Sequence, residues 1–291
     1  MINALNLGAS LFIPASNKNL CDILEGKKYP FLKSIVIDFE DGYDGDNQKE
    51  ILQNIEKLKK KSLITLIRFS TPYELNHALK KFDLSKIDGF VLPKFSLKNA
   101  NKYIKIIKDP SFTHFISIAI EEEELFNENK LRELKSYIDQ VRLKVVNIRF
   151  GAEDMFRQLG LRRECDKTLF DYSVASSVIA TMIKVFKLDG YSISGAVFRC
   201  FKDDKNFIKD VQRDIREGLL SKSVIHPQQV LLFDQIYKVS EEDYADAQAV
   251  LQAHTKVLNL HNTMLEKLTQ SSWAQGIIER EKIYGLSNYH T

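Results

Sequence analysis

Chargeable side chains stand at, or just past, the ends of six apolar runs in this 291-residue chain. In chain order they are Glu40, Asp41, Arg68, Lys94, Glu121, Asp154 and His226. Carboxylates bind hard cations such as Mg²⁺, and a guanidinium binds a carboxylate through two parallel hydrogen bonds. Because both signs of charge recur at the same point of successive runs, the pattern favours one shared site over unrelated surface positions.

Glu121 and Asp154 are the candidate metal ligands. Two converging carboxylates suit Mg²⁺, which keeps several waters and takes only one or two protein carboxylates. Each residue also falls near the expected start of a helix, where the helix dipole favours acidic side chains whatever their function. We predict that the two carboxylates lie close enough to share one Mg²⁺.

Arg68 ends an otherwise apolar run, LITLIRFS (63–70). A guanidinium at that depth needs an anionic partner, because an unpaired buried charge is costly. Its planar fork suits a substrate carboxylate, while an ion pair with Glu40 or Asp41 is the structural alternative. Lys94, in LPK, could form a Schiff base or bind phosphate, but an ion pair is the favoured interpretation.

Eight short apolar runs must position these side chains. They are ASLFIPA (9–15), SIVIDFED (34–41), LITLIRFS (63–70), GFVLPKF (89–95), HFISIAIE (114–121), VVNIRFG (145–151), YSISGAVF (191–198) and KSVIHP (222–227). Near-continuous apolar runs are typical of parallel strands buried on both faces. Separated by amphipathic helical patterns, the eight runs predict an α/β fold, the (β/α)8 or TIM barrel, whose active site lies at the carboxyl ends of the strands.

An open doubly wound sheet is the alternative fold, but no glycine-rich nucleotide-binding motif follows any run. The barrel is expected over residues 1–235, with a C-terminal helical extension over 236–291. Residues 240–289 look purely helical. In this tail Trp273, Ile277 and Tyr284 form an apolar stripe. The stripe packs either on the barrel mouth of a neighbouring chain or within its own chain.

Composition excludes several classes of protein. The net charge of +3 is too small to indicate nucleic-acid binding, and no run of about 18 apolar residues indicates a membrane span. The N-terminus lacks the pattern of a signal peptide. Cys21, Cys165 and Cys200 are few and far apart, so we expect neither a disulfide framework nor a zinc site. These features predict a cytoplasmic protein.

Seven short motifs carry a resemblance to a known family. LFIPA, DFED, the Arg68 run followed by STPY, LPK, IE, GAEDMFRQLG and IHPQQV stand in the order found in HpcH/HpaI aldolase/citrate lyase proteins. The chain resembles the citrate lyase β-subunit branch of that family most. The resemblance runs from about residue 8 to about residue 250, with each motif at the end of an expected strand.

The resemblance implies a Mg²⁺-dependent barrel, trimeric or hexameric, that makes or breaks a carbon–carbon bond through a metal-stabilised enolate. Its partner would be a 2-oxo or hydroxy acid, or the acyl-CoA adduct of that acid. By position, Arg68 is similar to the arginine that grips the oxo acid carboxylate. Glu121 and Asp154 match the metal ligands, with Glu121 also beside the substrate, and Glu40 and Asp41 match the family's acidic pair.

One position departs from the family. Thioester-cleaving relatives carry an aspartate in the tail, and our match of the tail places Ala274 there. Two classes of function therefore stand. The first is a carbon–carbon lyase or aldolase. The second is a barrel that binds a metal and an oxo acid as a non-catalytic or weakly catalytic component of a larger assembly. The chemistry of Arg68, Glu121 and Asp154 favours the enzyme.

Overall fold

A computed structural model describes residues 2–59, 62–260 and 263–287. The chain divides into two compact units, Met1–Val230 and Leu231–Thr291. Among the described residues no helix is both long and apolar enough to cross a membrane. The candidate site residues of the sequence all fall in the first unit.

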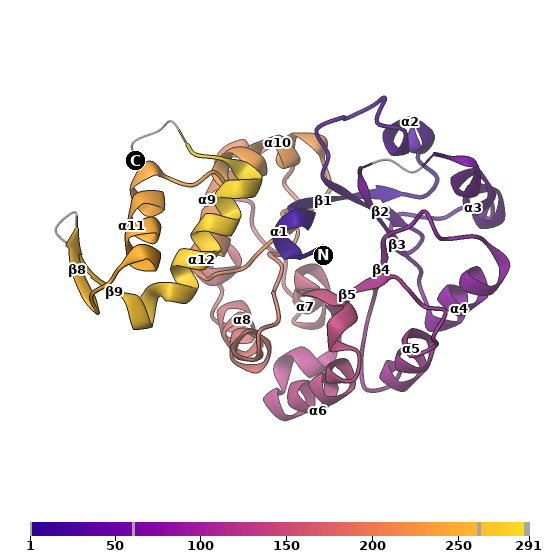
Figure 1. Ribbon diagram of the computed structural model, residues 1–291. Helices are drawn as coiled ribbons and strands as arrows, with labels where there is room; N and C mark the ends of the chain where they lie inside the picture. Colours follow the sequence, from indigo (N-terminus) through magenta and orange to yellow (C-terminus); the bar gives the residue numbers. More distant parts are fainter. Residues whose placement is uncertain (1, 60–61, 261–262, 288–291) are drawn as a thin grey trace. The chain divides into compact units, whose positions relative to one another are not determined.

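A curled parallel sheet forms the centre of the first unit (Figure 1). Its strands are β1 (Ala9–Pro14), β2 (Ser34–Asp38), β3 (Ile64–Arg68), β4 (Gly89–Leu92), β5 (Phe115–Ile120), β6 (Val145–Phe150) and β7 (Lys222–Val224), in the spatial order β6-β5-β4-β3-β2-β1-β7. Seven of the eight expected runs therefore form strands. The register pairs Asp38 with Arg68, and Arg68 with Val91, so the carboxyl ends of neighbouring strands are level.

The expected seventh strand, residues 191–198, does not form a regular strand. It makes one parallel bridge to each edge of the sheet, Ile193 to Ile148 of β6 and Gly195 to Lys222 of β7. Gly195 in this segment and the three-residue length of β7 limit the number of backbone pairs that can form between them. The bridges nevertheless join both edges, and the sheet closes into the predicted barrel.

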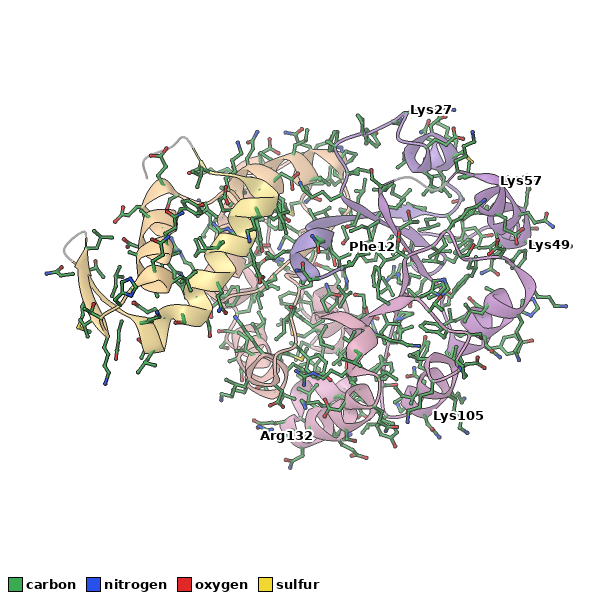
Figure 2. The ribbon with its side chains drawn as sticks, in the orientation of Figure 1. Phe12, Lys27, Lys49, Lys57, Lys105 and Arg132 are labelled. Atoms are coloured by element: carbon green, nitrogen blue, oxygen red, sulfur yellow. A yellow bond between two sulfur atoms is a disulfide. The ribbon has the colours of Figure 1, made fainter. Side chains whose placement is uncertain are left out.

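Helices connect successive strands. In the first unit they are α1 (Ala4–Leu7), α2 (Leu20–Leu24), α3 (Gln48–Lys57), α4 (Pro72–Lys81), α5 (Ala100–Ile107), α6 (Glu128–Asp139), α7 (Ala152–Gln158), α8 (Ser173–Phe186) and α9 (Asp204–Arg216), with four short 3₁₀ turns, η1 (Glu123–Phe126), η2 (Arg142–Lys144), η3 (Leu169–Asp171) and η4 (Lys187–Asp189). Helix α10 (Pro227–Ile236) spans the boundary between the units. Phe12 lies inside the barrel, whereas charged side chains such as Lys105 and Arg132 point outward from the surrounding helices (Figure 2).

Apolar residues form part of the barrel interior below the strand ends. Val36, Leu66, Val91, Ala119 and Val146, one from each of five strands, form a buried cluster. Continuous apolar runs were expected for strands covered on both faces, and this packing is the physical reason that they recur. The cluster makes a rigid base for the side chains above it.

The second unit corrects the expectation of a purely helical tail. Helices α11 (Glu241–Gln252) and α12 (Lys267–Tyr284) pack together, but the antiparallel strands β8 (Val257–Leu260) and β9 (Thr263–Glu266) lie between them in the chain. The strand segments are too short to show a clear alternation in sequence. Ala274 is fully buried in this unit's own core.

The cysteines give a second correction. Cys165 and Cys200 form a disulfide with their Cα atoms 5.8 Å apart, although 35 residues separate them in sequence. The fold brings together the two loops that carry them, because the segment before Cys200 runs beside β6, where Ile193 bridges to Ile148. Cys21 is free and exposed. The prediction of a cytoplasmic protein rested in part on unpaired cysteines, and the disulfide removes that part of its support.

Candidate active site

Except for His226, which follows β7, the expected site residues gather at the carboxyl ends of β2 to β6. Asp41, Arg68, Glu121 and Asp154 line a cavity of about 440 Å³ there. A larger cavity, about 1190 Å³, lies between α4 and α5 and contains none of these residues. The smaller cavity is therefore the candidate site, because it combines enclosure with convergent charged groups.

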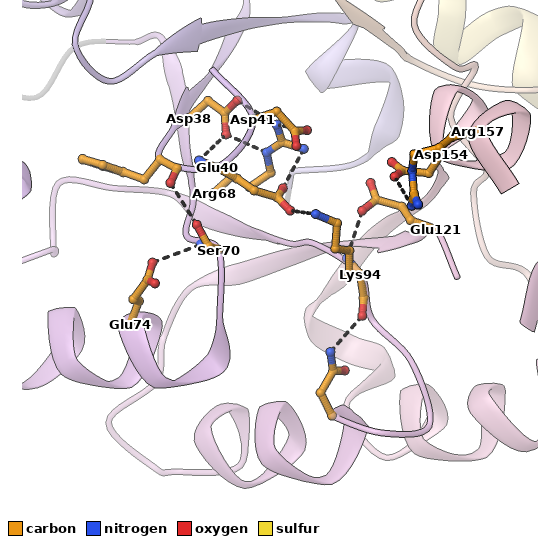
Figure 3. Close-up of polar contacts among 12 residues, drawn as sticks. Asp38, Glu40, Asp41, Arg68, Ser70, Glu74, Lys94, Glu121, Asp154 and Arg157 are labelled. Atoms are coloured by element: carbon orange, nitrogen blue, oxygen red, sulfur yellow. Dashed lines mark hydrogen bonds and ion pairs between the residues drawn. The ribbon is translucent and has the colours of Figure 1, made fainter. Parts of the chain in front are cut away.

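Arg68 is held by three carboxylates. Its Nε and Nη2 donate to the two carboxylate oxygens of Asp38, both at 2.7 Å, in a bidentate pair. Nη2 also donates to Asp41 at 2.9 Å, and Nη1 lies 3.0 Å from Glu40 (Figure 3). Burial alone would lower the pKa of Arg68, but these carboxylates outweigh it and raise that pKa. The structural ion pair considered from the sequence is thus present, and Asp38 is its main partner.

Lys94 links this cluster to Glu121. Its Nζ lies 2.7 Å from Glu40, which confirms the favoured ion-pair interpretation. Its backbone N–H donates to Glu121 Oε2 at 3.1 Å. Lys94 has a positive φ of 45°, a strained conformation for a residue with a side chain. In this conformation the amide points toward Glu121, so the backbone helps to orient that carboxylate.

Glu121 and Asp154 lie on either side of Gly151. An ideal Cβ at Gly151 would stand 2.6 Å from Glu121 Cγ and 3.2 Å from Asp154 Oδ2, so the two side chains flank one small space. Glu121 follows β5 directly, and Asp154 lies in the first turn of α7. Arg157 pairs with Asp154 at 3.0 Å on the solvent side. The structure thus brings together the two carboxylates that were expected to share a metal.

Burial raises the pKa of Glu121 to about 7, and the nearby charges of Glu40 and Asp154 add to this effect, while Arg68 opposes it. Carboxylates that repel one another in a buried place favour either a proton or a cation between them. Their oxygen atoms are the ligands that Mg²⁺ prefers. Within the described residues no group of three or more His, Cys, Asp or Glu side chains is arranged for a metal. Two carboxylates plus water and substrate oxygens fit Mg²⁺, which takes few protein ligands.

Sequence reasoning missed two residues of this site. Asp38 lies within the second run, and its partnership with Arg68 follows from direct cross-strand register. Arg149 lies in VVNIRFG, an apolar run like that of Arg68, so the same argument from a buried guanidinium could have found it. His226 accepts a hydrogen bond from the backbone N–H of Gln228, which is a local role within its own loop.

Comparison with known proteins now identifies the family. A family model described as a carbon–carbon bond lyase of the TIM-barrel fold matches residues 1–286. The chain belongs to this family. The resemblance drawn from the motifs is confirmed, as are the α/β barrel and the enzyme class. The carbon–carbon lyase is therefore favoured over a non-catalytic component. No curated protein matches the chain.

Solved structures of citrate lyase proteins share the fold of this carbon–carbon bond lyase. A citrate lyase from Burkholderia xenovorans LB400 has a TM-score of 0.73 at 15% identity, covering 97% of this chain and 93% of that one. CitE from Mycobacterium tuberculosis, solved with magnesium, acetoacetate and coenzyme A, has a TM-score of 0.68 at 18% identity, covering 96% and 100%. The M. tuberculosis citrate lyase β subunit, solved with oxaloacetate and magnesium, has a TM-score of 0.60 at 18% identity, covering 81% and 99%.

Proposed function

We propose that this carbon–carbon lyase is a Mg²⁺-dependent enzyme of the citrate lyase β-subunit type, acting on a 2-oxo or hydroxy acid or on its acyl-CoA adduct. The placement of Glu121 and Asp154 around Gly151, in one cavity, is the observation that carries the proposal. The magnesium and oxaloacetate in the M. tuberculosis structure support it.

Glu121 and Asp154 would hold the ion, and Lys94 would orient Glu121 through its backbone N–H. When bound, Mg²⁺ supplies Lewis acidity for the negative charge that develops on a carbonyl oxygen while the neighbouring carbon–carbon bond breaks or forms. The cavity walls also contain Val91, Ala119 and Phe150, which limit the access of water to that charge.

Arg68, Glu40 and Asp41 would act beside the metal. Three of the five N–H groups of Arg68 donate to Asp38 and Asp41, and Nη1 lies 3.0 Å from Glu40, so the donors that remain for an oxygen of the substrate are on Nη1. Asp41 reaches the cavity and is largely exposed, so it is the candidate for proton transfer. Glu40 does not line the cavity, and we assign it the positioning of Arg68 and Lys94.

Isothermal titration of Mg²⁺ into the wild-type protein, Glu121→Gln and Asp154→Asn tests the metal site. Each substitution removes one anionic ligand, so Mg²⁺ affinity should fall by about tenfold or more. Glu123→Gln is the matched control, since Glu123 is exposed in the same acidic segment and pairs with Lys130. Its affinity for Mg²⁺ should equal that of the wild type.

Incubation with Mg²⁺ and a panel of 2-oxo acids and CoA thioesters, followed by mass spectrometry, tests the reaction. Carbon–carbon cleavage or formation that disappears in both ligand variants but persists in Glu123→Gln is the expected result. Equal Mg²⁺ affinity in all four proteins would overturn the assignment of the ligands. Turnover that does not change when EDTA removes the metal would overturn the dependence on Mg²⁺.

A further inference from the structure

Among the described residues, Arg149 is a buried cation without a counter-charge. It lies on β6, is 4% exposed, and donates to three serine hydroxyls. Nε donates to Ser117 at 2.7 Å, Nη1 to Ser223 at 2.7 Å and Nη2 to Ser10 at 3.1 Å. Throughout the described part of the chain no carboxylate pairs with it. Burying a charge with only neutral partners is costly, and such a group therefore favours an anion from outside the chain.

The neighbouring guanidinium shows the contrast. Arg68 and Arg149 both lie near the ring of Phe12, at 5.2 and 5.7 Å from its centroid. Arg68 is neutralised by Asp38, Glu40 and Asp41. Burial lowers the pKa of Arg149 to about 10, with a further contribution from Arg68, and no anion in the described part of the chain opposes the shift. An anion that enters this cavity is therefore attracted more by Arg149 than by Arg68.

Donors remain for such an anion. Three of the five N–H groups of Arg149 are bonded to serines, which leaves two. Arg149 and Ser223 both line the cavity. Because the Ser223 oxygen accepts from Arg149, its own hydroxyl proton is available to a further acceptor. Two N–H groups and one O–H suit the oxygens of a carboxylate.

The cavity limits the size of the ligand. Arg149 bonds Ser117, four residues before Glu121 in the chain, and Arg149, Glu121 and Asp154 all line the same cavity of about 440 Å³. A ligand that reaches from Arg149 to the two carboxylates is therefore confined to this cavity and must be short. Phe12, Val91 and Ala119 line the same cavity and suit a short carbon chain.

We propose that Arg149 binds a second carboxylate of the substrate at the base of the cavity, and that it selects short dicarboxylic 2-oxo acids over monocarboxylic ones. The proposal rests on the proposed function for the other end of the ligand, at Glu121 and Asp154. Arg149 is thus a specificity-determining residue for the reaction.

Calorimetric titrations compare oxaloacetate with pyruvate, both with Mg²⁺, in the wild type, Arg149→Gln, Arg149→Lys and Arg132→Gln. Arg132 is the control, a half-exposed arginine on α6 that pairs with Glu128. The wild type and the control should bind oxaloacetate at least about tenfold more tightly than pyruvate, as expected for charge-assisted hydrogen bonds. Arg149→Gln should lose this preference while its pyruvate affinity changes less than about threefold, and Arg149→Lys should keep part of it.

Two further measurements separate this proposal from the metal site. Titration of Mg²⁺ alone into each variant tests whether Glu121 and Asp154 still bind the ion. Succinate without Mg²⁺ probes the Arg149 carboxylate site alone, and its binding should fall about tenfold or more in Arg149→Gln. Loss of succinate binding supports the Arg149 site even in a protein that binds no Mg²⁺.

Equal affinity of the wild type for oxaloacetate and pyruvate would overturn the proposal, and this result needs no variant. A folded Arg149→Gln protein, with wild-type circular dichroism, that keeps the preference for oxaloacetate would overturn it as well.

Discussion

Gly151 leaves the space in which Glu121 and Asp154 meet. Its φ of −83° is open to any residue, so its backbone conformation does not require glycine. The requirement is steric, because a Cβ would stand 2.6 Å from Glu121 Cγ. Cγ is close to the backbone and moves only with the whole side chain. The absence of a side chain at Gly151 therefore leaves room for Glu121, which follows β5, beside Asp154 of α7.

Gly151→Ala is expected to displace Glu121 and to weaken Mg²⁺ binding by about tenfold or more, with a stability loss of about 1–3 kcal/mol from overpacking. Calorimetry and urea unfolding measure the two effects. Gly276→Ala is the control, because nothing lies within 4 Å of its Cβ position on α12. That variant should bind Mg²⁺ normally and unfold at an equal or slightly higher urea concentration. Normal Mg²⁺ affinity in Gly151→Ala would show that the space is not needed.

At the scale of elements, β7 is joined to α9 by a buried ion network. Lys222 Nζ lies 2.9 Å from Asp210 and 2.5 Å from Asp214, and Arg163 also pairs with Asp210. All four side chains are almost completely buried. Burial raises the pKa of Asp214 to about 6, and Asp210 adds to the shift, while Lys222 opposes it. Two cations balance two carboxylates in this network, so the short strand β7 depends on the presence of all four charges.

Lys222→Met should destabilise the protein by about 3–5 kcal/mol at pH 8, because it leaves two buried carboxylates with one cation. The raised pKa of Asp214 sets the sign of the pH effect. Lys222 lowers the pKa of Asp214, so in Lys222→Met this pKa lies above its wild-type value of about 6. Protonation of Asp214 as the pH falls removes the unpaired charge, so the difference in stability from the wild type should be smaller at pH 5 than at pH 8. Urea unfolding of both proteins at each pH gives these differences.

Arg132→Met is the control for removal of a cation. The ion pair between Arg132 and Glu128 is half-exposed, so the free energy of unfolding should fall by no more than about 1 kcal/mol. A Lys222→Met protein that is as stable as this control at pH 8 would contradict the importance of the network.

At the scale of the whole molecule, the C-terminal unit has its own core. Val239, Ala247, Val250 and Leu265 surround Ala274, and Arg280 donates to backbone oxygens within the unit. Of the expected apolar stripe, Ile277 and Tyr284 are buried and Trp273 is 40% exposed. Ala274 is buried inside its own unit, so packing within the chain, one of the two alternatives drawn from the sequence, describes this residue. Assembly as a trimer or hexamer stays a prediction.

Ala274→Asp is therefore expected to destabilise the unit by about 2–4 kcal/mol, since it buries a carboxylate among apolar side chains. Hydrogen exchange over residues 231–287 in the full chain measures this, and the exposed neighbouring position provides the control Gln275→Asp. A variant with unchanged exchange protection that newly hydrolyses CoA thioesters would instead show that the position can serve the family's aspartate.

Local pattern determined much of the fold. Strands covered on both faces are apolar along nearly their whole length, so apolar runs locate them. Seven of the eight runs found in the sequence form strands in the structure. The carboxyl ends of parallel strands meet at one end of a barrel, which is why Glu121 and Asp154 could be paired across 33 positions. The short β8–β9 hairpin could not be found in this way, because segments of four residues carry too little periodicity.

Only the tertiary structure decided what each charged group contacts. In sequence, Arg68 and Arg149 look alike, each a single arginine in an apolar run. The fold places Asp38 opposite Arg68 in strand register but places three serines around Arg149, so one cation is neutralised and the other is left for a ligand. The Cys165–Cys200 bond has the same cause, since it joins loops 35 residues apart. Residue types and periodicity are local properties of the chain, whereas partners across a barrel depend on its closure.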